Sequence, residues 1–299
     1  MRNTLACVVV VSVGAFWGLY WIPLRQLDAA ISTGSWATFI VLLPACLFLA
    51  PFALRGRRRI ASSRKRMLAS TALGGCSFAL YSNGLVYGQV TVVILLFYLT
   101  PVWSTLLARY CLQQPVARQR YVAIAAGILG IAIVLHAHGG GFPWPHSLGD
   151  WFGLISGFLW AVSSMGIQGG SRLRPVEANF IFCFSALITA LLVVVALGQA
   201  APAHTASGAY AAAAGWAALI GIFWWGCLLV GFLWAAQILE PAQVGILLMS
   251  EAVMGALSAG LFAGEPFGLL MIVGTSLVVI AGLLGSVAAK PAADQSTPC

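Results

Sequence analysis

The sequence predicts an all-α membrane protein with ten transmembrane helices, arranged as two inverted repeats of five. Three observations lead to this fold class. Hydrophobic residues make up 61% of the 299 residues and charged residues only 7%, whereas soluble domains carry about 25% charged residues. The positive charges fall in alternate gaps between apolar stretches, and landmarks of the first half of the chain recur in the second half.

Ten apolar stretches approach the roughly 20 residues that a helix needs to cross the hydrocarbon core. The expected spans are residues 4–22, 34–54, 68–87, 90–108, 121–137, 149–169, 178–198, 212–236, 241–263 and 266–287. We expect the first span to be retained as a helix, because its apolar run exceeds that of a usual signal peptide and nine further spans follow it.

The distribution of lysine and arginine predicts how the chain is oriented in the membrane. Of the fifteen such residues, fourteen lie near the termini or in alternate loops, and Arg25 alone lies on the other side. Because positive charge is retained on the cytoplasmic side, both termini are expected in the cytoplasm. The expected location is a bacterial-type inner (plasma) membrane, which the chain crosses many times.

The second half of the chain repeats landmarks of the first half in the same order. Gly14 and Trp17 in the first span correspond to Gly157 and Trp160 in the sixth. The fourth and ninth spans also correspond, through Pro101 followed by Gln114-Pro115 and through Glu251 followed by Glu265-Pro266. Because five spans are an odd number, the second repeat begins on the opposite side of the membrane. This inverted arrangement is typical of secondary transporters.

We therefore expect one integral membrane domain built from two repeats. Residues 1–140 form the first repeat, with spans one to five, and residues 141–299 form the second repeat and a short C-terminal tail.

The sequence lacks the nucleotide-binding and cysteine motifs that are typical of many soluble enzymes. No P-loop GxxxxGK[ST] segment occurs, and the seven cysteines show no CxxC spacing. His136, His138 and His146 could ligate a metal, but a plain glycine-rich connector between the repeats is the preferred interpretation. We expect no enzymatic activity, no cofactor, no metal and no nucleic-acid partner.

Polar and aromatic side chains at the depth of the bilayer centre indicate where a substrate cavity would lie, because they are costly to expose to lipid. Several of them recur at helical spacing within one span, which places them on one face. The candidate substrate-binding residues are Trp17, Tyr20, Ser77, Tyr81, Asn83, Tyr98, Ser156, Trp160, Ser163, Ser164, Trp224 and Glu251. The alternative for each residue is packing against a neighbouring helix.

Glu251 is the one acidic residue well inside an expected span. A buried carboxylate costs about 2.5 to 3.5 kcal/mol on the insertion scale, so Glu251 must be neutral or partnered. It either couples transport to protons or binds a cation, or it is a protonated acid that only links two helices. Pro101 cannot donate a helical hydrogen bond, so it should free the carbonyl of Phe97.

At these residues the chain resembles the drug/metabolite transporter superfamily, in particular its ten-helix EamA-type members. The resemblance rests on the Gly-x-x-Trp pattern in each half, on Pro101, on Glu251 and on the turn Gly264-Glu265-Pro266. Ala252 departs from the proline that many members have at this position, and Gln114 replaces an acidic residue. The aromatic lining is similar to that of YddG-like amino-acid exporters. The resemblance implies export from the cytoplasm through a central cavity between the two halves.

The preferred function is therefore a secondary transporter that exports small organic solutes by alternating access. Amino acids with aromatic or hydrophobic side chains and related metabolites are the first candidates for its substrate. A multidrug exporter of lipophilic cations, with Glu251 as counter-ion, is the alternative. A membrane-embedded enzyme or a lipid scramblase is the third hypothesis. The expected partners are a small-molecule substrate and the lipid bilayer, and the pattern is compatible with a monomer.

Overall fold

The computed structural model describes residues 2–31, 34–111, 113, 118–139, 144–167, 173–202, 207–239, 241–265 and 268–287. Within these ranges the regular elements are all helices, so the predicted all-helical class is confirmed. The helices are α1 (Arg2–Gly18), α2 (Trp21–Ile31), α3 (Ser35–Arg55), α4 (Arg57–Ala61), α5 (Lys65–Tyr87), α6 (Val90–Phe97), α7 (Thr100–Tyr110), α8 (Arg118–Gly139), α9 (Leu148–Ile167), α10 (Pro175–Ala196), α11 (Ser207–Ile220), the π-helix η1 (Gly221–Leu228), α12 (Leu229–Ala236), α13 (Pro241–Phe262) and α14 (Leu269–Val287).

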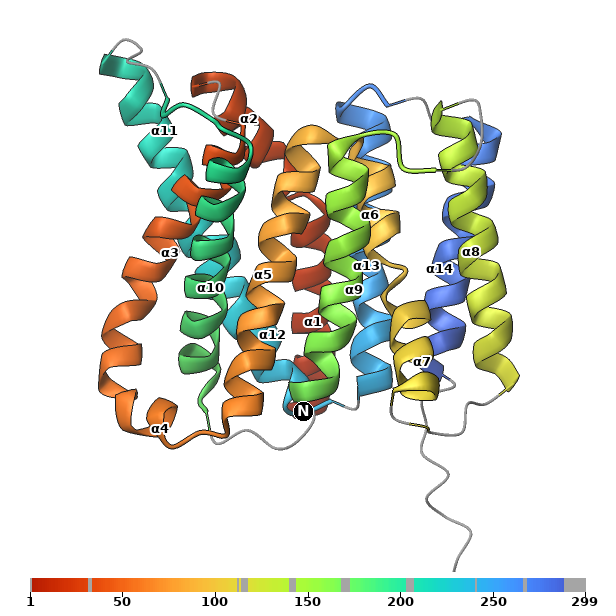
Figure 1. Ribbon diagram of the computed structural model, residues 1–299, viewed down its shortest axis with the longest axis horizontal. Coiled ribbons are helices and arrows are strands. Elements are labelled where there is room, and N and C mark those ends of the chain that lie inside the picture. The colour runs from red at the N-terminus through yellow and green to blue at the C-terminus, as the bar shows by residue number, and fades with distance from the viewer. Residues whose placement is uncertain are drawn as a thin grey trace, which may run out of the picture.

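The long helices run side by side as one bundle (Figure 1). Among the described residues, seven segments are long and apolar enough to cross a membrane: Arg2–Ala30, Ser35–Arg55, Val90–Tyr110, Arg118–His138, Pro175–Ala196, Ala213–Ala236 and Gln243–Phe262. The chain is thus a multi-pass helical membrane protein. Helices α5, α9 and α14 coincide with the other three expected spans. The arrangement as ten spans in two inverted repeats stays a prediction.

Two expected spans are interrupted near their middle. The span at 90–108 consists of α6 and α7, with Tyr98 and Leu99 between them, because Pro101 cannot donate to the carbonyl of Phe97. The span at 212–236 passes from α11 through the π-helical turns of η1 into α12. Such irregular backbone is tolerated at membrane depth where protein or a cavity surrounds it.

Two short helices lie where the sequence predicted loops. Helix α2 follows α1 after a bend at Leu19 and Tyr20, and α4 follows α3 directly after Gly56. Arg59 of α4 donates from Nε to Oε1 of Glu177 at 2.9 Å, which fastens α4 to the start of α10. The predicted landmarks Gln114, Pro115 and Pro266 lie outside the described residues. Two of the fifteen Lys and Arg residues, Arg172 and Lys290, also lie outside them, as do the predicted repeat boundary at 140–141 and the tail at 291–299.

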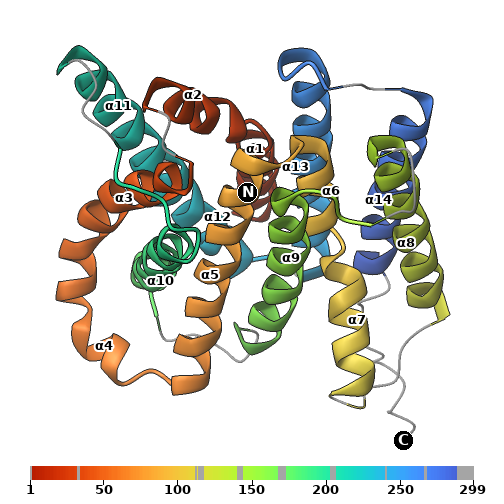
Figure 2. The ribbon, with the colours of Figure 1, turned by 45° about the horizontal axis from the view of Figure 1, so that its top comes forward.

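Glycines let helices from the two halves of the chain approach closely. A Cβ atom on Gly18 of α1 would lie only 2.6 Å from the carbonyl oxygen of Glu251 on α13. A Cβ atom on Gly149 of α9 would collide with the backbone nitrogen of Gly88, at the end of α5. Small residues at such contacts are typical of membrane helices, which gain van der Waals contact by close approach. The pairs α1 with α13 and α5 with α9 form the centre of the bundle, between α3 and α10 on one side and α8 and α14 on the other (Figure 2).

The turn between α5 and α6 is fastened by two charged side chains. Arg25 of α2 donates from Nη2 to the carbonyl of Gly88 at 2.6 Å. Glu265, which follows α13, accepts from the backbone N–H groups of Val90 and Thr91 at 2.6 and 3.1 Å. The carboxylate thereby satisfies two of the free N–H groups at the start of α6.

Candidate functional site

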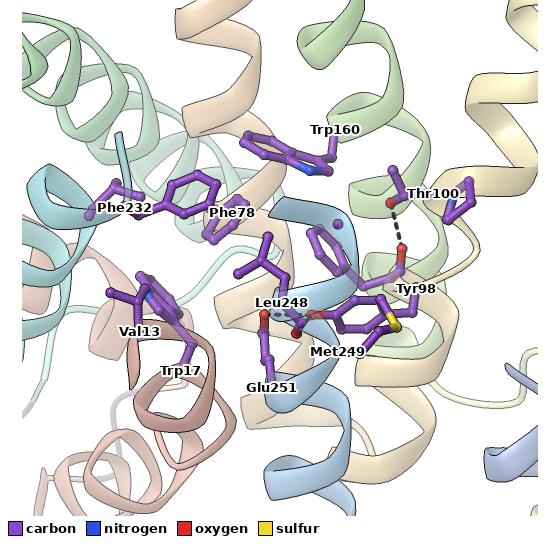
Figure 3. A pocket seen from close by; sticks show the side chains of 14 residues that line it. Val13, Trp17, Phe78, Tyr98, Thr100, Trp160, Phe232, Leu248, Met249 and Glu251 are labelled. Carbon is purple, nitrogen blue, oxygen red and sulfur yellow. Dashed lines mark hydrogen bonds between the residues drawn. The ribbon is translucent and has the colours of Figure 1, made fainter. Parts of the chain in front are cut away.

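A cavity of about 120 Å³ lies in the centre of the bundle. Its walls come from α1, α5, α6, α7, α9, α12 and α13, and thus from both halves of the chain. The lining residues are Val13, Trp17, Phe78, Phe97, Tyr98, Thr100, Pro101, Trp160, Leu229, Phe232, Gly245, Leu248, Met249 and Glu251. Figure 3 shows these side chains converging on the space between the helices. The lining is largely apolar, with a single carboxyl group.

Aromatic rings build one wall of the cavity, and Phe78 of α5 is at their centre. Its ring lies 5.3 Å from that of Trp17, 5.1 Å from that of Trp160 and 5.6 Å from that of Phe97, measured between centroids. All three contacts have the edge-to-face geometry that aromatic pairs prefer. Trp160 is only partly buried, so part of its ring is free to meet a solute.

Glu251 of α13 also lines the cavity and contacts two tyrosines. Tyr81 donates from its hydroxyl to Oε1 at 2.8 Å, and the Tyr98 hydroxyl lies 3.0 Å from Oε2. Glu251 is 4% exposed. Among the described residues the one ion pair formed by a glutamate joins Arg59 and Glu177, so no cation within the described chain neutralises Glu251. Its carboxyl group therefore depends on hydroxyl groups alone.

The break between α6 and α7 lies beside the cavity. Thr100 donates from its hydroxyl to the carbonyl of Phe97 at 2.7 Å and also contacts the carbonyl of Gly157 at 3.2 Å. The carbonyl of Phe97, which Pro101 was expected to free, is therefore satisfied by the side chain of Thr100. Tyr98 caps the end of α6 and donates to the carbonyl of Leu248 on α13 at 2.7 Å.

Four of the predicted site residues line the cavity together: Trp17, Tyr98, Trp160 and Glu251. Tyr81 lies behind them and reaches the site through its hydrogen bond to Glu251. The structure thus brings five predicted residues from four helices and the α6–α7 break into one place. That they bind substrate stays a prediction.

The other predicted residues lie away from the cavity lining, and each makes a hydrogen bond within the protein, although Oδ1 of Asn83 is buried without a partner. Ser77 donates to the carbonyl of Ser156, Ser156 to that of Gly153, Ser163 to that of Ser70, Ser164 to that of Ala161, Asn83 to that of Ala79, and Trp224 to that of Phe16. In a bilayer an unsatisfied polar group is expensive. These side chains therefore fasten helices to themselves or to neighbours.

Tyr20 belongs to a separate group, which we call the sealing layer and define as Tyr20, Thr38, Ser82 and Trp225. The Ser82 hydroxyl shares hydrogen bonds with the hydroxyls of Tyr20 and Thr38 at 2.8 and 3.0 Å. Trp225 donates from Nε1 to the Tyr20 hydroxyl at 3.1 Å. All four side chains are fully buried. The layer touches the cavity wall through Trp17, whose ring lies 5.0 Å from Tyr20.

Several lining residues could not be identified from the sequence. Phe78, Phe97, Phe232 and Met249 are apolar residues in apolar spans, so nothing in the pattern separates them from residues that face lipid. The position of Phe78 one helical turn before Tyr81 was the available signal, because both lie on one face of α5.

Comparison with known proteins finds a family model that matches the first part of the chain. Residues 4–136 match the EamA-like transporter family, which confirms the predicted resemblance to the drug/metabolite transporter superfamily. A search of curated proteins gives no match. One solved crystal structure, described only as that of a protein, is similar over 94% of this chain and 97% of its own, with a TM-score of 0.57 and 15% identity. At that identity the likeness shows a shared fold alone.

Proposed function

We propose that this chain, whose residues 4–136 match a family of membrane transporters, is a secondary transporter that exports small organic solutes by alternating access. Amino acids with aromatic or hydrophobic side chains, and related metabolites, are the proposed substrates. The observation that carries the proposal is the central cavity, which is walled by aromatic rings from both halves of the chain and lies beside a broken helix. Discontinuous helices at the midplane are typical of substrate sites in secondary transporters.

The pairing of helices supports the two inverted repeats at 1–140 and 141–299. Helix α1 packs on α13, and α9 packs on α6. These two pairs correspond to each other if the first span matches the sixth and the fourth matches the ninth. Helices α3 and α10 also pack together, as do α8 and α14, and each of these pairs joins a span to its proposed counterpart. Contacts of this kind are expected from a twofold axis in the membrane plane.

The chemistry of the lining supports a substrate with an apolar body and an amino group. The rings of Trp17, Phe78 and Trp160 offer stacking surfaces for the side chain. Glu251 and the hydroxyl of Thr100 offer acceptors for an ammonium group. The carboxylate of an amino acid would have to remain hydrated or meet a hydroxyl, since no Lys or Arg is among the lining residues.

The position of the cavity supports a conformation that receives solute from the cytoplasm. Its lining residues Gly245, Leu248 and Met249 lie toward the end of α13 that the charge pattern places in the cytoplasm, and α12, which supplies Leu229 and Phe232, is the half of the span at 212–236 that the same pattern places nearer the cytoplasm. The sealing layer lies toward the opposite side of the membrane. With both termini in the cytoplasm of a bacterial-type inner membrane, this arrangement is inward-facing.

Counterflow in proteoliposomes tests the proposal. Vesicles loaded with unlabelled L-tryptophan or L-leucine should accumulate the same labelled amino acid, and the rate should saturate. Trp160→Ala should lower this exchange strongly, whereas Trp216→Ala, at a 40% exposed tryptophan away from the cavity lining, should not. Absence of saturable counterflow with every amino acid tried would refute amino-acid export.

Export of lipophilic cations is the second candidate function, and one observation favours it. Glu251 supplies the sole carboxyl group in a lining that otherwise consists mainly of rings and aliphatic groups. An aromatic site attracts a cation by about 0.5 to 2 kcal/mol per ring contact. Saturable counterflow of tetraphenylphosphonium, lost in Glu251→Gln, would select this function over amino-acid export.

A further inference from the structure

The hydroxyl of Tyr98 has two partners but only one proton. It lies 2.7 Å from the carbonyl oxygen of Leu248 and 3.0 Å from Oε2 of Glu251. The carbonyl can only accept a hydrogen bond, so the Tyr98 proton must point at it for that contact to form. The contact with Oε2 is then satisfied only if the carboxyl group itself donates. Both contacts form together when Glu251 is protonated.

Glu265, another buried glutamate of the bundle, gives the opposite result. Both oxygens of Glu265 face backbone N–H groups, those of Val90 and Thr91. These groups only donate, so both carboxyl oxygens must accept, and a proton on Glu265 would have no partner. The two side chains are buried to a similar degree, at 4% and 9% exposed. Their hydrogen-bond partners therefore distinguish a proton-carrying site from a fixed carboxylate.

The surroundings of Glu251 contain little else that titrates. Tyr81 from α5 and Tyr98 from the α6–α7 break face it. Helix α1 packs against it through Gly14 and Gly18. The lining residues from α9, α12 and α13 include no further titratable group. A change in the protonation of Glu251 is therefore not compensated by a charged side chain beside it.

We propose that Glu251 carries one exchangeable proton and that Tyr98 is the switch that responds to it, which makes the transporter proton-coupled. This inference rests on the proposed transport function. In the protonated state Oε2–H donates to Tyr98, and Tyr98 donates to the carbonyl of Leu248. When the proton passes from Oε2 to a water molecule in the cavity, the Tyr98 hydroxyl turns and donates to the carboxylate. The carbonyl of Leu248 then loses this donor and becomes an acceptor for a substrate ammonium group.

The switch lies where it can act on the backbone. Tyr98 is the capping residue at the end of α6, next to the break that separates α6 from α7. Leu248 lies on α13, which packs against α6. Turning one hydroxyl therefore exchanges a bond between the broken helix and the backbone of α13 for a bond to the side chain of Glu251. Discontinuous helices form the substrate and coupling-ion sites of many secondary transporters, around which the two repeats move.

Infrared difference spectroscopy on the purified protein in lipid vesicles tests the proton site without a substrate. Wild type should show the carbonyl band of a protonated carboxylic acid at neutral pH, and Glu251→Gln should lack it. The control Glu177→Gln should keep the band, because Glu177 is ion-paired with Arg59. Tyr98→Phe should shift the frequency of the band, since the acid loses its acceptor, whereas Tyr87→Phe should not. A wild-type spectrum identical to that of Glu251→Gln, or a band that Tyr98→Phe leaves unmoved, would overturn the proposal.

Transport in proteoliposomes tests the coupling. The ratio of transport driven by a pH gradient to counterflow of L-tryptophan at equal pH should fall about tenfold or more in Glu251→Gln and in Tyr98→Phe, the effect of one lost hydrogen bond or more. It should stay unchanged in Glu177→Gln. An unchanged ratio in Glu251→Gln means that Glu251 does not couple protons, even if counterflow continues. A wild type without counterflow contradicts the transport function instead, and the infrared result still decides whether Glu251 holds a proton.

Discussion

The central cavity and the sealing layer are built from the same kinds of residue, yet they differ in how their polar groups are satisfied. In the sealing layer Tyr20, Thr38, Ser82 and Trp225 bond to one another and are fully buried. In the cavity Trp160 is partly exposed, and the single hydroxyl of Tyr98 contacts both Glu251 and a backbone carbonyl. A hydrogen-bond network in which every group has a partner fixes the helices in one arrangement. A network with fewer donors than acceptors can exchange partners.

The difference suggests how a bundle with few charges can bind and move solutes. Trp17 connects the two regions, because it lines the cavity and its ring lies 5.5 Å from that of Trp225 in the sealing layer. A solute against Trp17 would therefore press on the sealing layer directly.

The largest expected effect concerns the side of the membrane on which each region lies. In a variant without native cysteines, a cysteine at the exposed position of Trp144 should react with an impermeant thiol reagent from outside intact cells, and one at exposed Ser62 should not. The reason is that fourteen of the fifteen Lys and Arg residues share the side of Ser62, and positive charge is expected on the cytoplasmic side. Permeabilised cells serve as the control, since both positions should then react. The reversed pattern would place the sealing layer on the cytoplasmic side and make the structure outward-facing.

Replacing a tryptophan in each region should separate stability from transport. Trp225→Ala empties a fully buried position and removes the donor to Tyr20, so it should lower the free energy of unfolding by about 3 to 5 kcal/mol. Trp160→Ala should cost much less stability, because the ring is partly exposed, but should impair counterflow more. Denaturant unfolding of the purified proteins and counterflow measure the two effects. Equal stability losses for the two variants would remove the contrast between cavity and seal.

Glu251 should respond differently to two substitutions. Glu251→Ala leaves the hydroxyl of Tyr81 without its partner, so unfolding should become easier by about 1 to 3 kcal/mol. Glu251→Gln keeps hydrogen-bonding capacity, so its stability should lie closer to wild type while pH-driven transport falls. Thermal unfolding in detergent, measured beside the transport assays, separates these outcomes. A Gln variant with wild-type behaviour at every pH would reduce Glu251 to a link between helices.

The sequence indicated how deep each residue lies in the membrane, but not whether its side chain faces the cavity or a neighbouring helix. Hydropathy placed the long helices, and the spacing of polar residues found Trp17, Tyr98, Trp160 and Glu251, which meet in the cavity. Ser163 shared the stripe of Trp160, but its short side chain donates to the carbonyl of Ser70 instead. Whether a polar side chain meets a backbone carbonyl or open space depends on the neighbouring helix, which no single helix encodes.

The interruptions were predictable only in part, for a related reason. Pro101 in the sequence indicates a lost hydrogen bond, and the break before it follows from that. The π-helical turns of η1 contain no proline, and a close approach explains their position: a Cβ on Gly221 would collide with the carbonyl oxygen of Val41 on α3. Packing between helices distant in sequence therefore sets the irregular backbone there. Phe78 was missed for the same kind of reason, since its role comes from the rings around it.

The smallest expected effect comes from one hydroxyl of the sealing layer. Tyr20→Phe removes the acceptor of Trp225 and a partner of Ser82 while keeping the ring, so it should lower the free energy of unfolding by about 1 to 3 kcal/mol and leave the cavity lining intact. Tyr110→Phe is the matched control, because Tyr110 is 77% exposed and should change stability little. Denaturant unfolding of both variants measures the difference, and counterflow of Tyr20→Phe tests the role of the layer. If Tyr20 binds substrate, as the sequence suggested, transport should fall with stability unchanged. If Tyr20 instead closes the sealing layer, the free energy of unfolding should fall, and vesicles that hold the variant should leak solute faster than vesicles that hold wild type.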